Sequence, residues 1–482
     1  MATFRPQGLT YDDVLLVPKR SAVASRKHVT TTARLSRHIT LGIPIVSANM
    51  DTVTEAPMAV AMARQGGIGI IHRFMSIDQQ VRQIQQVKRA QGSVIEQPYT
   101  MLPTQTLAEA RRQLSELAVS GVLVVDDGGH LLGILTARDI RFATDPLQPI
   151  STLMTPRERL VTAPPSIDAA QARALLDRHK IEKLPLVDDG GIVRGLITSK
   201  DLLQTNRYGG MSRDGKGRLL VGAAIGVVGD YIERAEALWQ AGADALVIDI
   251  AHGHSDHVLA AVHALKGRPG CGDVIAGNVA TAEGTRALID AGADAVKVGV
   301  GPGSICTTRI VTGCGLPQLT AVLECAEEAA RDDISVIADG GVKASGDITK
   351  ALAAGASTVM LGSALAGTRE SPGYTVTRNG QRYKICRGMA SLSAAIGRQE
   401  REQSEVARDD GFNEVVPEGV EAVVPYRGDV ADIIYQLVGG LRSGMSYCGV
   451  RTLPDLREHA TFVPITGAGM RESQPHDVQA LS

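Results

Sequence analysis

Short apolar runs recur along most of the chain, and each run ends in glycine or in polar residues. Residues 44–51 read as a buried strand, residues 56–65 as a helix and residues 67–72 as the next strand. A strand, a helix and a second strand in succession favour a parallel sheet. The same alternation resumes later, with strands predicted at residues 219–224, 245–250, 274–278, 295–298, 335–338 and 358–361.

The helices between the later strands end in a repeated tetrapeptide. Ala-Gly-Ala-Asp occurs at residues 241–244 and 291–294, and Ala-Gly-Ala-Ser occurs at residues 354–357. We expect the glycine to follow the last helical turn and the next apolar run to be a strand. With the two N-terminal strands, these units predict an α/β protein with a (β/α)8 barrel. A doubly wound sheet is disfavoured, because no Gly-x-Gly-x-x-Gly opens a helix after an early strand.

The pattern changes near residue 97, where prolines become frequent and an internal repeat begins. Val-Val-Asp-Asp-Gly-Gly at 124–129 recurs as Leu-Val-Asp-Asp-Gly-Gly at 186–191, an offset of 62 residues. Each copy predicts a helix, a strand, a turn at Asp-Gly-Gly, a second strand and a further helix entered through Thr-x-Arg/Lys-Asp. We therefore expect residues 1–96 and 206–482 to form the barrel, and residues 97–205 to form a module inserted in one barrel loop.

The repeat resembles a pair of CBS motifs, the tandem known as a Bateman module. That resemblance implies binding of purine nucleotides such as ATP or GTP. It would place Asp139 and Asp201 near ribose hydroxyls, and Thr136 and Thr198 near phosphate. The alternative is that each aspartate only caps its own helix, which is a common role for this residue type.

Composition and charge narrow the classes of function. The formal net charge of −2 argues against a general electrostatic nucleic-acid binder. No apolar run reaches membrane-spanning length, and residues 1–8 carry no signal-peptide core, so we expect a cytoplasmic enzyme. The six cysteines form no Cys-x-x-Cys pair, which argues against a zinc site or a disulfide framework.

In a (β/α)8 barrel the functional groups follow the carboxyl ends of the strands. The loops at residues 339–341 and 362–363 are rich in glycine, and their backbone N–H groups, with the hydroxyls of Ser304 and Ser363, suit a phosphate dianion. Asp339 is suited to accept hydrogen bonds from a ribose diol. The alternative for these glycines is close packing of strands against helices.

Residues 296–315 combine a strand with a loop that contains many glycines and Cys306. Glycines let a backbone approach a ligand closely. A cysteine at the mouth of a barrel strand is a candidate nucleophile, because thiolates attack electrophilic carbons near neutral pH. Thr308 could then position or relay a proton. The alternative is a structural cysteine, which is what we expect for Cys271 and Cys325.

Several motifs are similar to those of the IMP dehydrogenase/GMP reductase family. The likeness covers nearly the whole chain and is strongest in Gly-Pro-Gly-Ser-Ile-Cys-Thr-Thr-Arg at residues 301–309. Further matching motifs lie at residues 9–18, 47–51, 277–281, 339–342, 365–368 and 387–389. The resemblance implies a barrel enzyme in which Cys306 forms a covalent thioimidate at C2 of a purine nucleotide.

The resemblance also implies the residues that hold each ligand. The implied GMP- or IMP-binding set is Ser47, Met50, Ser304, Asp339, Gly340, Gly341, Gly362, Ser363, Gly388, Met389, Ala390, Glu418 and Gly419. The implied nicotinamide-nucleotide set is Arg73, Asp249, Ile250, Ala251, Val300 and Gly301. A potassium ion is implied at Gly301, Gly303, Cys306 and Arg309, completed by Glu472 and Ser473 from a neighbouring subunit. A homotetramer, or tetramers stacked into an octamer, is implied as well.

The family carries out two reactions that share the same adduct. The dehydrogenase oxidises IMP with NAD and hydrolyses the adduct with an Arg-Tyr pair upstream of a Pro-Glu-Gly. Here Pro-Glu-Gly lies at residues 417–419, but residues 401–408 and their surrounding segment contain no Arg-Tyr. The reductase needs no such pair, because it expels ammonia from GMP and reduces the adduct with NADPH. The resemblance therefore predicts GMP reductase, with Cys306, Thr308 and Glu418 as catalytic residues.

Three alternatives stay open at this point. Glu418 could be an ordinary solvated loop carboxylate. The whole protein could be an IMP dehydrogenase with an altered segment before Pro-Glu-Gly. It could also be a nucleotide-sensing protein whose barrel has lost catalysis, although the presence of Cys306, Thr308 and Glu418 argues against that reading.

Overall fold

The computed structural model describes residues 4–90, 95, 98–117, 119–199, 210–389, 391 and 417–475. The chain divides into two compact units. One unit contains residues 1–88, 210–214 and 219–482, and the other contains residues 89–209 and 215–218. The predicted limits of the inserted module, residues 97 and 205, both lie inside the second unit. Within the described residues, no helix combines the length and apolarity that crossing a membrane requires.

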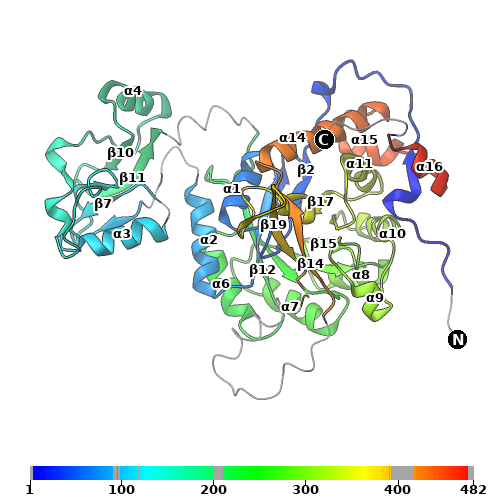
Figure 1. The fold of residues 1–482 in the computed structure, drawn as a ribbon. Helices are drawn as coiled ribbons and strands as arrows, with labels where there is room; N and C mark the ends of the chain where they lie inside the picture. Colours follow the sequence, from blue (N-terminus) through cyan, green and yellow to red (C-terminus); the bar gives the residue numbers. More distant parts are fainter. Residues whose placement is uncertain are drawn as a thin grey trace. The chain divides into compact units, whose positions relative to one another are not determined.

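In the larger unit, eight of the described strands close into a parallel barrel surrounded by helices (Figure 1). The strands, in order around the barrel, are β12 (Val221–Ile225), β13 (Ala245–Asp249), β14 (Asp273–Val279), β15 (Ala295–Val298), β16 (Ser335–Asp339), β17 (Thr358–Leu361), β4 (Ile45–Ser47) and β5 (Ile68–Ile71). The surrounding helices are α1 (Ala56–Arg64), α2 (Ile77–Arg89), α6 (Tyr231–Ala241), α7 (Asp256–Lys266), α8 (Ala282–Asp290), α10 (Gln318–Ala330), α11 (Ser345–Ala353) and α12 (Ser363–Ala366). The predicted (β/α)8 barrel with an inserted module is confirmed.

The repeated tetrapeptides end helices as predicted. Gly242, Gly292 and Gly355 have φ angles of 97°, 104° and 106°, a left-handed conformation that favours glycine. In the first two copies, the aspartate that follows ties two neighbouring strands together at their amino ends. In the second copy, Asp294 donates its N–H to the carbonyl of Val274, and its carboxylate accepts from the N–H of Val274 at 2.8 Å.

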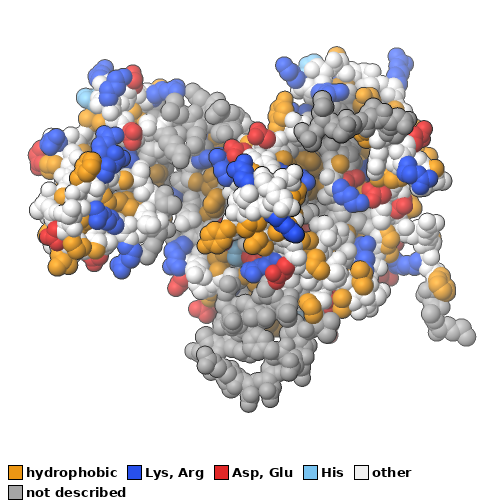
Figure 2. Space-filling model, in the orientation of Figure 1, with side chains coloured by type: hydrophobic (Ala, Val, Ile, Leu, Met, Phe, Trp, Pro, Cys, Tyr) orange, Lys and Arg blue, Asp and Glu red, His pale blue; other side chains and the backbone are white. Residues whose placement is uncertain are grey.

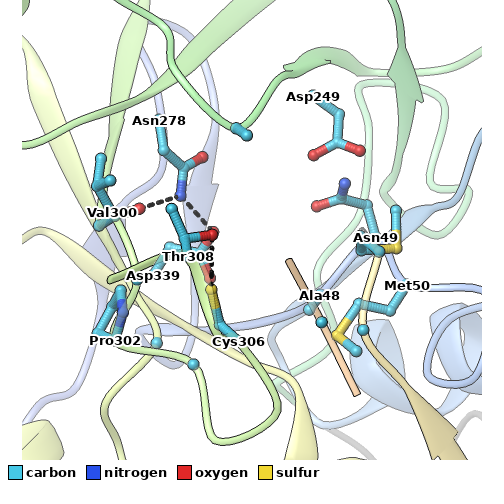
Figure 3. Close-up of a pocket in the computed structure, with 18 of the residues that line it drawn as sticks. Ala48, Asn49, Met50, Asp249, Asn278, Val300, Pro302, Cys306, Thr308 and Asp339 are labelled. Atoms are coloured by element: carbon cyan, nitrogen blue, oxygen red, sulfur yellow. Dashed lines mark hydrogen bonds between the residues drawn. The ribbon is translucent and has the colours of Figure 1, made fainter. Parts of the chain in front are cut away.

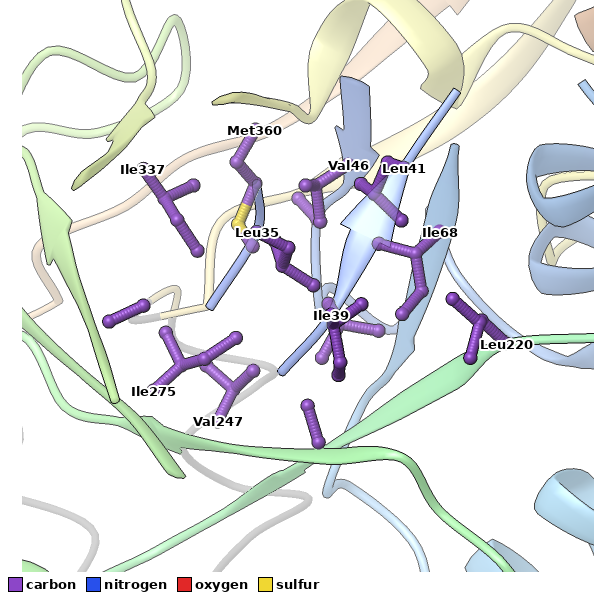
Figure 4. Close-up of a cluster of buried hydrophobic side chains, with 14 of the residues drawn as sticks. Leu35, Ile39, Leu41, Val46, Ile68, Leu220, Val247, Ile275, Ile337 and Met360 are labelled. Atoms are coloured by element: carbon purple, nitrogen blue, oxygen red, sulfur yellow. The ribbon is translucent and has the colours of Figure 1, made fainter. Parts of the chain in front are cut away.

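The barrel interior is filled by apolar side chains at its amino end. Val46, Ile68, Val247, Ile275 and Ile337 point inward from the strands, and all are fully buried. The segment that contains β2 (Ala33–Arg34) and β3 (Thr40–Leu41) places three more side chains in this cluster, as Figure 4 shows: Leu35, Ile39 and Leu41. The barrel is therefore a packed core at this end, and a cavity can exist only toward the other end.

The remaining described elements of the larger unit flank the barrel. A three-stranded antiparallel sheet consists of β18 (Thr375–Arg378), β19 (Gln381–Arg387) and β20 (Glu421–Pro425). Hydrophobic side chains lie on the surface over this sheet (Figure 2), where Ile385 and Val423 are paired and exposed. The other elements are η1 (Tyr11–Asp13), β1 (Val14–Leu16), η2 (Arg26–His28), α9 (Thr308–Thr312), α14 (Val430–Tyr447), α15 (Leu453–His459), β21 (Phe462–Pro464) and α16 (Gly467–Glu472).

The inserted unit contains two copies of a helix followed by a strand pair. The first copy has α3 (Leu107–Glu116), β7 (Gly121–Val125) and β8 (Leu131–Thr136), and the second has α4 (Ala169–His179), β10 (Lys183–Val187) and β11 (Val193–Thr198). Short elements complete the unit: β6 (Thr100–Met101), η3 (Ile150–Thr152), β9 (Thr155–Pro156) and η4 (Arg157–Arg159). The predicted repeat is confirmed, but the predicted helix after Thr136 is wrong, because residues 137–142 form turns.

The two Asp-Gly-Gly turns of the inserted unit bond to each other. Leu131 donates its N–H to the carbonyl of Gly191, and Val193 donates its N–H to the carbonyl of Gly129, both at 3.0 Å. Gly129 and Gly191 have φ angles of 81° and 80°. The two copies of the repeat thus meet through equivalent residues.

Candidate active site

A cavity of about 440 Å³ opens at the carboxyl ends of the barrel strands (Figure 3). The polar and reactive side chains that line it come from seven segments far apart in the sequence: Asn49, Arg73, Asp249, Asn278, Lys297, Cys306, Thr308, Asp339 and Glu418. In Figure 3, Cys306 and Thr308 lie across the cavity from Asn49 and Met50. The predicted location of the site at this end of the barrel agrees with this geometry.

The loop that carries Cys306 depends on glycines for close packing. A Cβ atom on Gly299, which has a φ of 149°, would lie 2.2 Å from the carbonyl oxygen of Asp339. A Cβ on Gly301 would lie 2.5 Å from the side chain of Arg309. The Arg309 guanidinium donates to the carbonyls of Val300 at 3.1 Å and Leu316 at 2.5 Å. These contacts fix the loop against β16 and against its own return segment.

Cys306, Thr308 and Glu418 form a hydrogen-bonded chain in the cavity wall. The Cys306 Sγ lies 3.2 Å from the Thr308 hydroxyl, which donates to the Glu418 carboxylate at 2.8 Å. Backbone bonds hold the two segments together, because Thr307 donates its N–H to the carbonyl of Glu418 at 2.8 Å. Glu418 is therefore tied to the cysteine loop, and the alternative of a solvated loop carboxylate does not describe it.

Other cysteines of the barrel unit have environments that disfavour a thiolate. Burial raises the pKa of the Cys325 thiol to about 12, and burial also raises the pKa of the Cys386 thiol. A thiolate is the nucleophilic form, so these buried thiols are poor nucleophiles. Cys306 differs because it lines the cavity and is only partly buried.

The floor of the cavity is a buried polar network across three adjacent strands. The Lys297 ammonium donates to Asp339 Oδ2 at 2.8 Å and to Asn278 Oδ1, and Asn278 Nδ2 donates to the same Asp339 oxygen at 2.9 Å. Lys297 is only 2% exposed. Burial by itself lowers the pKa of Lys297, but the charges of Asp339 and Asp249 outweigh burial and the pKa is raised. The lysine therefore remains a buried cation at neutral pH.

Gln318 supports the same network from α10. Its side-chain amide donates to the carbonyl of Val298 at 2.9 Å and to the carbonyl of Asp339 at 3.1 Å. Neither Lys297 nor Gln318 was among the predicted site residues. A signal existed for Lys297, since a lysine within the apolar run Ala-Val-Lys-Val at residues 295–298 has to point toward a polar group.

A second part of the cavity suits a planar, polar ligand. Arg73 lies with its guanidinium 5.4 Å from the centre of the Phe74 ring and 3.9 Å from the Asp249 carboxylate. Its Nε is buried and forms no hydrogen bond within the described residues. An unpartnered buried donor of this kind fits a polar group of a bound molecule. Ile250, Ala251, Val300 and Gly301, all predicted nicotinamide-binding residues, line the same cavity.

The predicted nucleotide-binding residues separate into two groups. Those that line the cavity are Met50, Asp339, Gly340, Gly388, Met389, Glu418 and Gly419. Ser47, Ser304, Gly341, Gly362 and Ser363 lie outside the lining set, and Ala390 lies outside the described residues. Ser47 is fully buried and its hydroxyl accepts from Thr54 at 2.8 Å, so it supports the strand end from beneath.

The predicted potassium site remains a prediction. Gly301, Gly303 and Cys306 lie together in the loop that carries Cys306, and carbonyl oxygens are suitable potassium ligands. The Arg309 side chain is itself a cation without an acceptor, so only its backbone carbonyl could contribute. Ser473 donates its hydroxyl to the carbonyl of Gly469 beside α16. The predicted contribution of Glu472 and Ser473 concerns a neighbouring subunit.

The predicted regulatory residues lie in the inserted unit. The Asp139 carboxylate accepts from both the N–H and the hydroxyl of Thr136 at 2.7 Å, so both bonds lie within its own turn. Thr198 is the last residue of β11, and Asp201 lies outside the described residues. A cavity of about 530 Å³ opens beside α4, lined by Arg173, Asp177, Lys180 and Ser199 among others.

Comparisons with known proteins agree with this geometry. Residues 8–476 match the model of the IMP dehydrogenase / GMP reductase domain. An inosine-5′-monophosphate dehydrogenase of Nitrosopumilus maritimus is 54% identical over 98% of both chains. A GMP reductase of Leishmania donovani is 52% identical over 99% of this chain and 98% of the relative.

A solved structure is similar over the full length as well. It is a cysteine-to-alanine variant of GMP reductase from Trypanosoma brucei in complex with guanosine 5′-monophosphate. Its sequence is 48% identical, its TM-score is 0.88, and the match covers 98% of this chain and 99% of that one. With the barrel, the cysteine loop and these matches in agreement, this chain belongs to the IMP dehydrogenase/GMP reductase family of oxidoreductases.

Proposed function

We propose that this protein is an NADPH-dependent GMP reductase, which converts GMP into IMP and ammonia. The observation that carries the proposal is the absence of an Arg-Tyr pair in the segment before Pro417-Glu418-Gly419, where dehydrogenases of the family activate water. The bond between Thr308 and Glu418 supports it, because release of ammonia needs a proton donor beside Cys306.

The side chains at the cavity account for the first half of the reaction. The Cys306 thiolate attacks C2 of GMP and forms a carbon–sulfur bond. Thr308 and Glu418 carry a proton to the 2-amino group, which then leaves as ammonia. The product of this half-reaction is a thioimidate on Cys306.

The second half requires two electrons at C2. A nicotinamide nucleotide would supply these as hydride, and the residues that would hold it are Arg73, Asp249 and the backbone at Val300 and Gly301. Cys306 then leaves as a thiolate and IMP is released. The Nε of Arg73, which makes no hydrogen bond within the described residues, is a suitable donor for a polar group of that nucleotide.

Further parts of the proposal concern partners. We expect purine nucleotides such as ATP or GTP to bind the inserted unit, a monovalent cation such as potassium to bind the catalytic loop, and the chain to assemble as a homotetramer or a stacked octamer in the cytoplasm. Arg173 at the second cavity supplies positive charge that suits phosphate groups, whereas Lys180 is paired with Asp177 at 2.8 Å.

The direct test measures reduced nicotinamide by its absorbance in two reactions with the purified protein and potassium. One contains GMP and NADPH, and the other contains IMP and NAD. A GMP reductase consumes NADPH in the first and leaves the second unchanged. Formation of NADH in the second reaction with no change in the first contradicts the proposal.

The second candidate function is IMP dehydrogenase. Several of the similar relatives carry that name, including the one that is 54% identical. In that case a group other than an Arg-Tyr pair must activate water, and the two-reaction test separates the candidates.

A further inference from the structure

The two oxygens of the Asp339 carboxylate are in different situations. Oδ2 accepts hydrogen bonds from both Lys297 and Asn278. Oδ1 accepts none within the described residues, although the side chain lines the cavity and is 22% exposed. One oxygen is thus anchored to the floor, and the other is available to a molecule in the cavity.

The Asp339 carboxylate is held in place mainly by the charge of Lys297. A carboxylate at this depth needs a compensating cation, and Lys297 is the cation whose nitrogen lies 2.8 Å away. Asn278 adds a neutral hydrogen bond that fixes the plane of the carboxylate. The backbone on the opposite side cannot shift freely, since Gln318 holds the Asp339 carbonyl and Gly299 packs directly against it.

We infer that Lys297 is a positioning residue that holds Asp339 for the ribose hydroxyls of the bound nucleotide, and that it thereby sets the preference for ribonucleotides over 2′-deoxyribonucleotides. The inference rests on the nucleotide-binding part of the proposed function. It does not require either redox reaction, because GMP and IMP carry the same ribose.

Direct binding tests the inference without turnover. Titration calorimetry on the full-length protein with a Cys306→Ala background compares GMP with 2′-deoxy-GMP, and IMP with 2′-deoxy-IMP. We expect the parent protein to bind the ribonucleotide about 10-fold or more tightly, as for a hydrogen bond to a charged group. Lys297→Met and Asp339→Asn should each reduce that preference to about 3-fold or less.

The double variant shows whether the two residues act together. Because Lys297 acts through Asp339, Lys297→Met in an Asp339→Asn background should change the preference no further. A matched control is Lys88→Met, which removes another buried lysine that bonds an aspartate, Asp244, at 2.7 Å near the amino ends of the barrel strands. The control should lower the melting temperature but keep the ribose preference.

The outcomes separate a positioning role from a purely structural one. If Lys297→Met weakens binding of the ribonucleotide and of its 2′-deoxy counterpart by the same factor, Lys297 only stabilises the fold and the inference is wrong. It is also wrong if the parent protein shows no ribose preference. If Lys297→Met cannot be purified, Lys297→Gln provides the same comparison with a shorter neutral donor. A protein that binds IMP but does not bind GMP would contradict the proposed reductase. The comparison of IMP with 2′-deoxy-IMP would still test the role of Lys297.

Discussion

Both ends of the barrel hold carboxylates, but the hydrogen bonds and ion pairs of these carboxylates differ. The amino-end Asp294 is buried, whereas Asp339 and Asp249 at the carboxyl end are partly buried. At the amino end, Asp294 accepts from Lys266 and from the Val274 N–H at 2.8 Å, and its other oxygen lies 3.4 Å from Arg37. At the carboxyl end, Asp339 has one bonded oxygen, and Asp249 lies 3.9 Å from Arg73. The charges at the amino end are therefore paired within the protein, whereas the carboxyl end keeps hydrogen-bonding capacity for a ligand.

Within one fold, residues that stabilise the protein and residues available to a ligand thus lie at opposite ends of the barrel. Unsatisfied polar groups in a protein interior cost free energy, so they persist where a ligand completes them. In barrels the amino face is associated with stability and the carboxyl face with catalysis. Variants at one end should therefore change turnover with little effect on unfolding, and variants at the other end should do the reverse.

The largest effect should come from the nucleophile. Cys306→Ala should lower turnover by a factor on the order of 10⁴ or more, while GMP binding and the melting temperature stay close to those of the parent. The measurement is NADPH consumption together with calorimetry. Cys314→Ala, which changes an exposed cysteine in the same loop, is the matched control and should remain active. A Cys306→Ala enzyme with normal turnover would rule out the covalent mechanism.

The proton-transfer pair should rank next. Thr308→Val and Glu418→Gln should each reduce kcat by about 10²–10⁴-fold, the usual contribution of general acid–base catalysis. The double variant should be little worse than either single one, because the two groups form one chain. Thr307→Val is the control, since that hydroxyl makes no hydrogen bond within the described residues. Independent, multiplicative losses in the double variant would show that the pair does not act as a unit.

At the amino end the expected change is in stability. Asp294→Ala leaves Lys266 and the buried Val274 N–H without their acceptor, which should lower the free energy of unfolding by about 3 kcal/mol. Denaturant unfolding measures the loss, and kcat per folded molecule should be unchanged. Asp290→Ala, at a surface ion pair four residues earlier, should cost under about 1 kcal/mol. A drop in kcat for Asp294→Ala would break the separation between the two ends.

A smaller effect at the same end should depend on pH. Burial raises the pKa of Asp273, but hydrogen bonds from Ser36 and His38 outweigh burial and the pKa is lowered. Its stabilising contribution is therefore present above the unfolded pKa, about 3.9, and is lost as pH falls through the folded-state value. Asp273→Asn should lower the free energy of unfolding by about 1 kcal/mol at pH 7. In acid, the variant and the parent should have the same free energy of unfolding. A difference in unfolding free energy that does not change with pH would show that the carboxylate charge is not its cause.

The sequence predicts those parts of the molecule that depend on local patterns. The barrel follows from the alternation of apolar runs, and its helix ends follow from Gly242, Gly292 and Gly355. The position of Cys306 at the cavity follows from its glycine-rich loop after a barrel strand. These features are set by residues close together in the chain, so a single sequence contains them.

The parts that sequence reasoning missed depend on closure of the barrel. Lys297, Asn278 and Asp339 meet only because three strands lie side by side, and Gln318 reaches them from a helix. Ser47 was expected to face the ligand, but its side chain alternates to the buried face and bonds Thr54. The helix expected after Thr136 is replaced by turns at residues 137–142, although Asp139 bonds back to Thr136 as a residue at a helix start does.

The paired turns of the inserted unit have the geometry of a homodimer. The bond from Leu131 to Gly191 and the bond from Val193 to Gly129 are the same contact repeated 62 residues apart. Each copy therefore donates to the other the same hydrogen bond that it accepts. Reciprocity of this kind is the mark of an isologous interface between identical subunits. Because both bonds join backbone groups, the side chains of either copy can differ while the contact is kept. Duplication and fusion would in this way turn a symmetric dimer into a unit with two unequal halves.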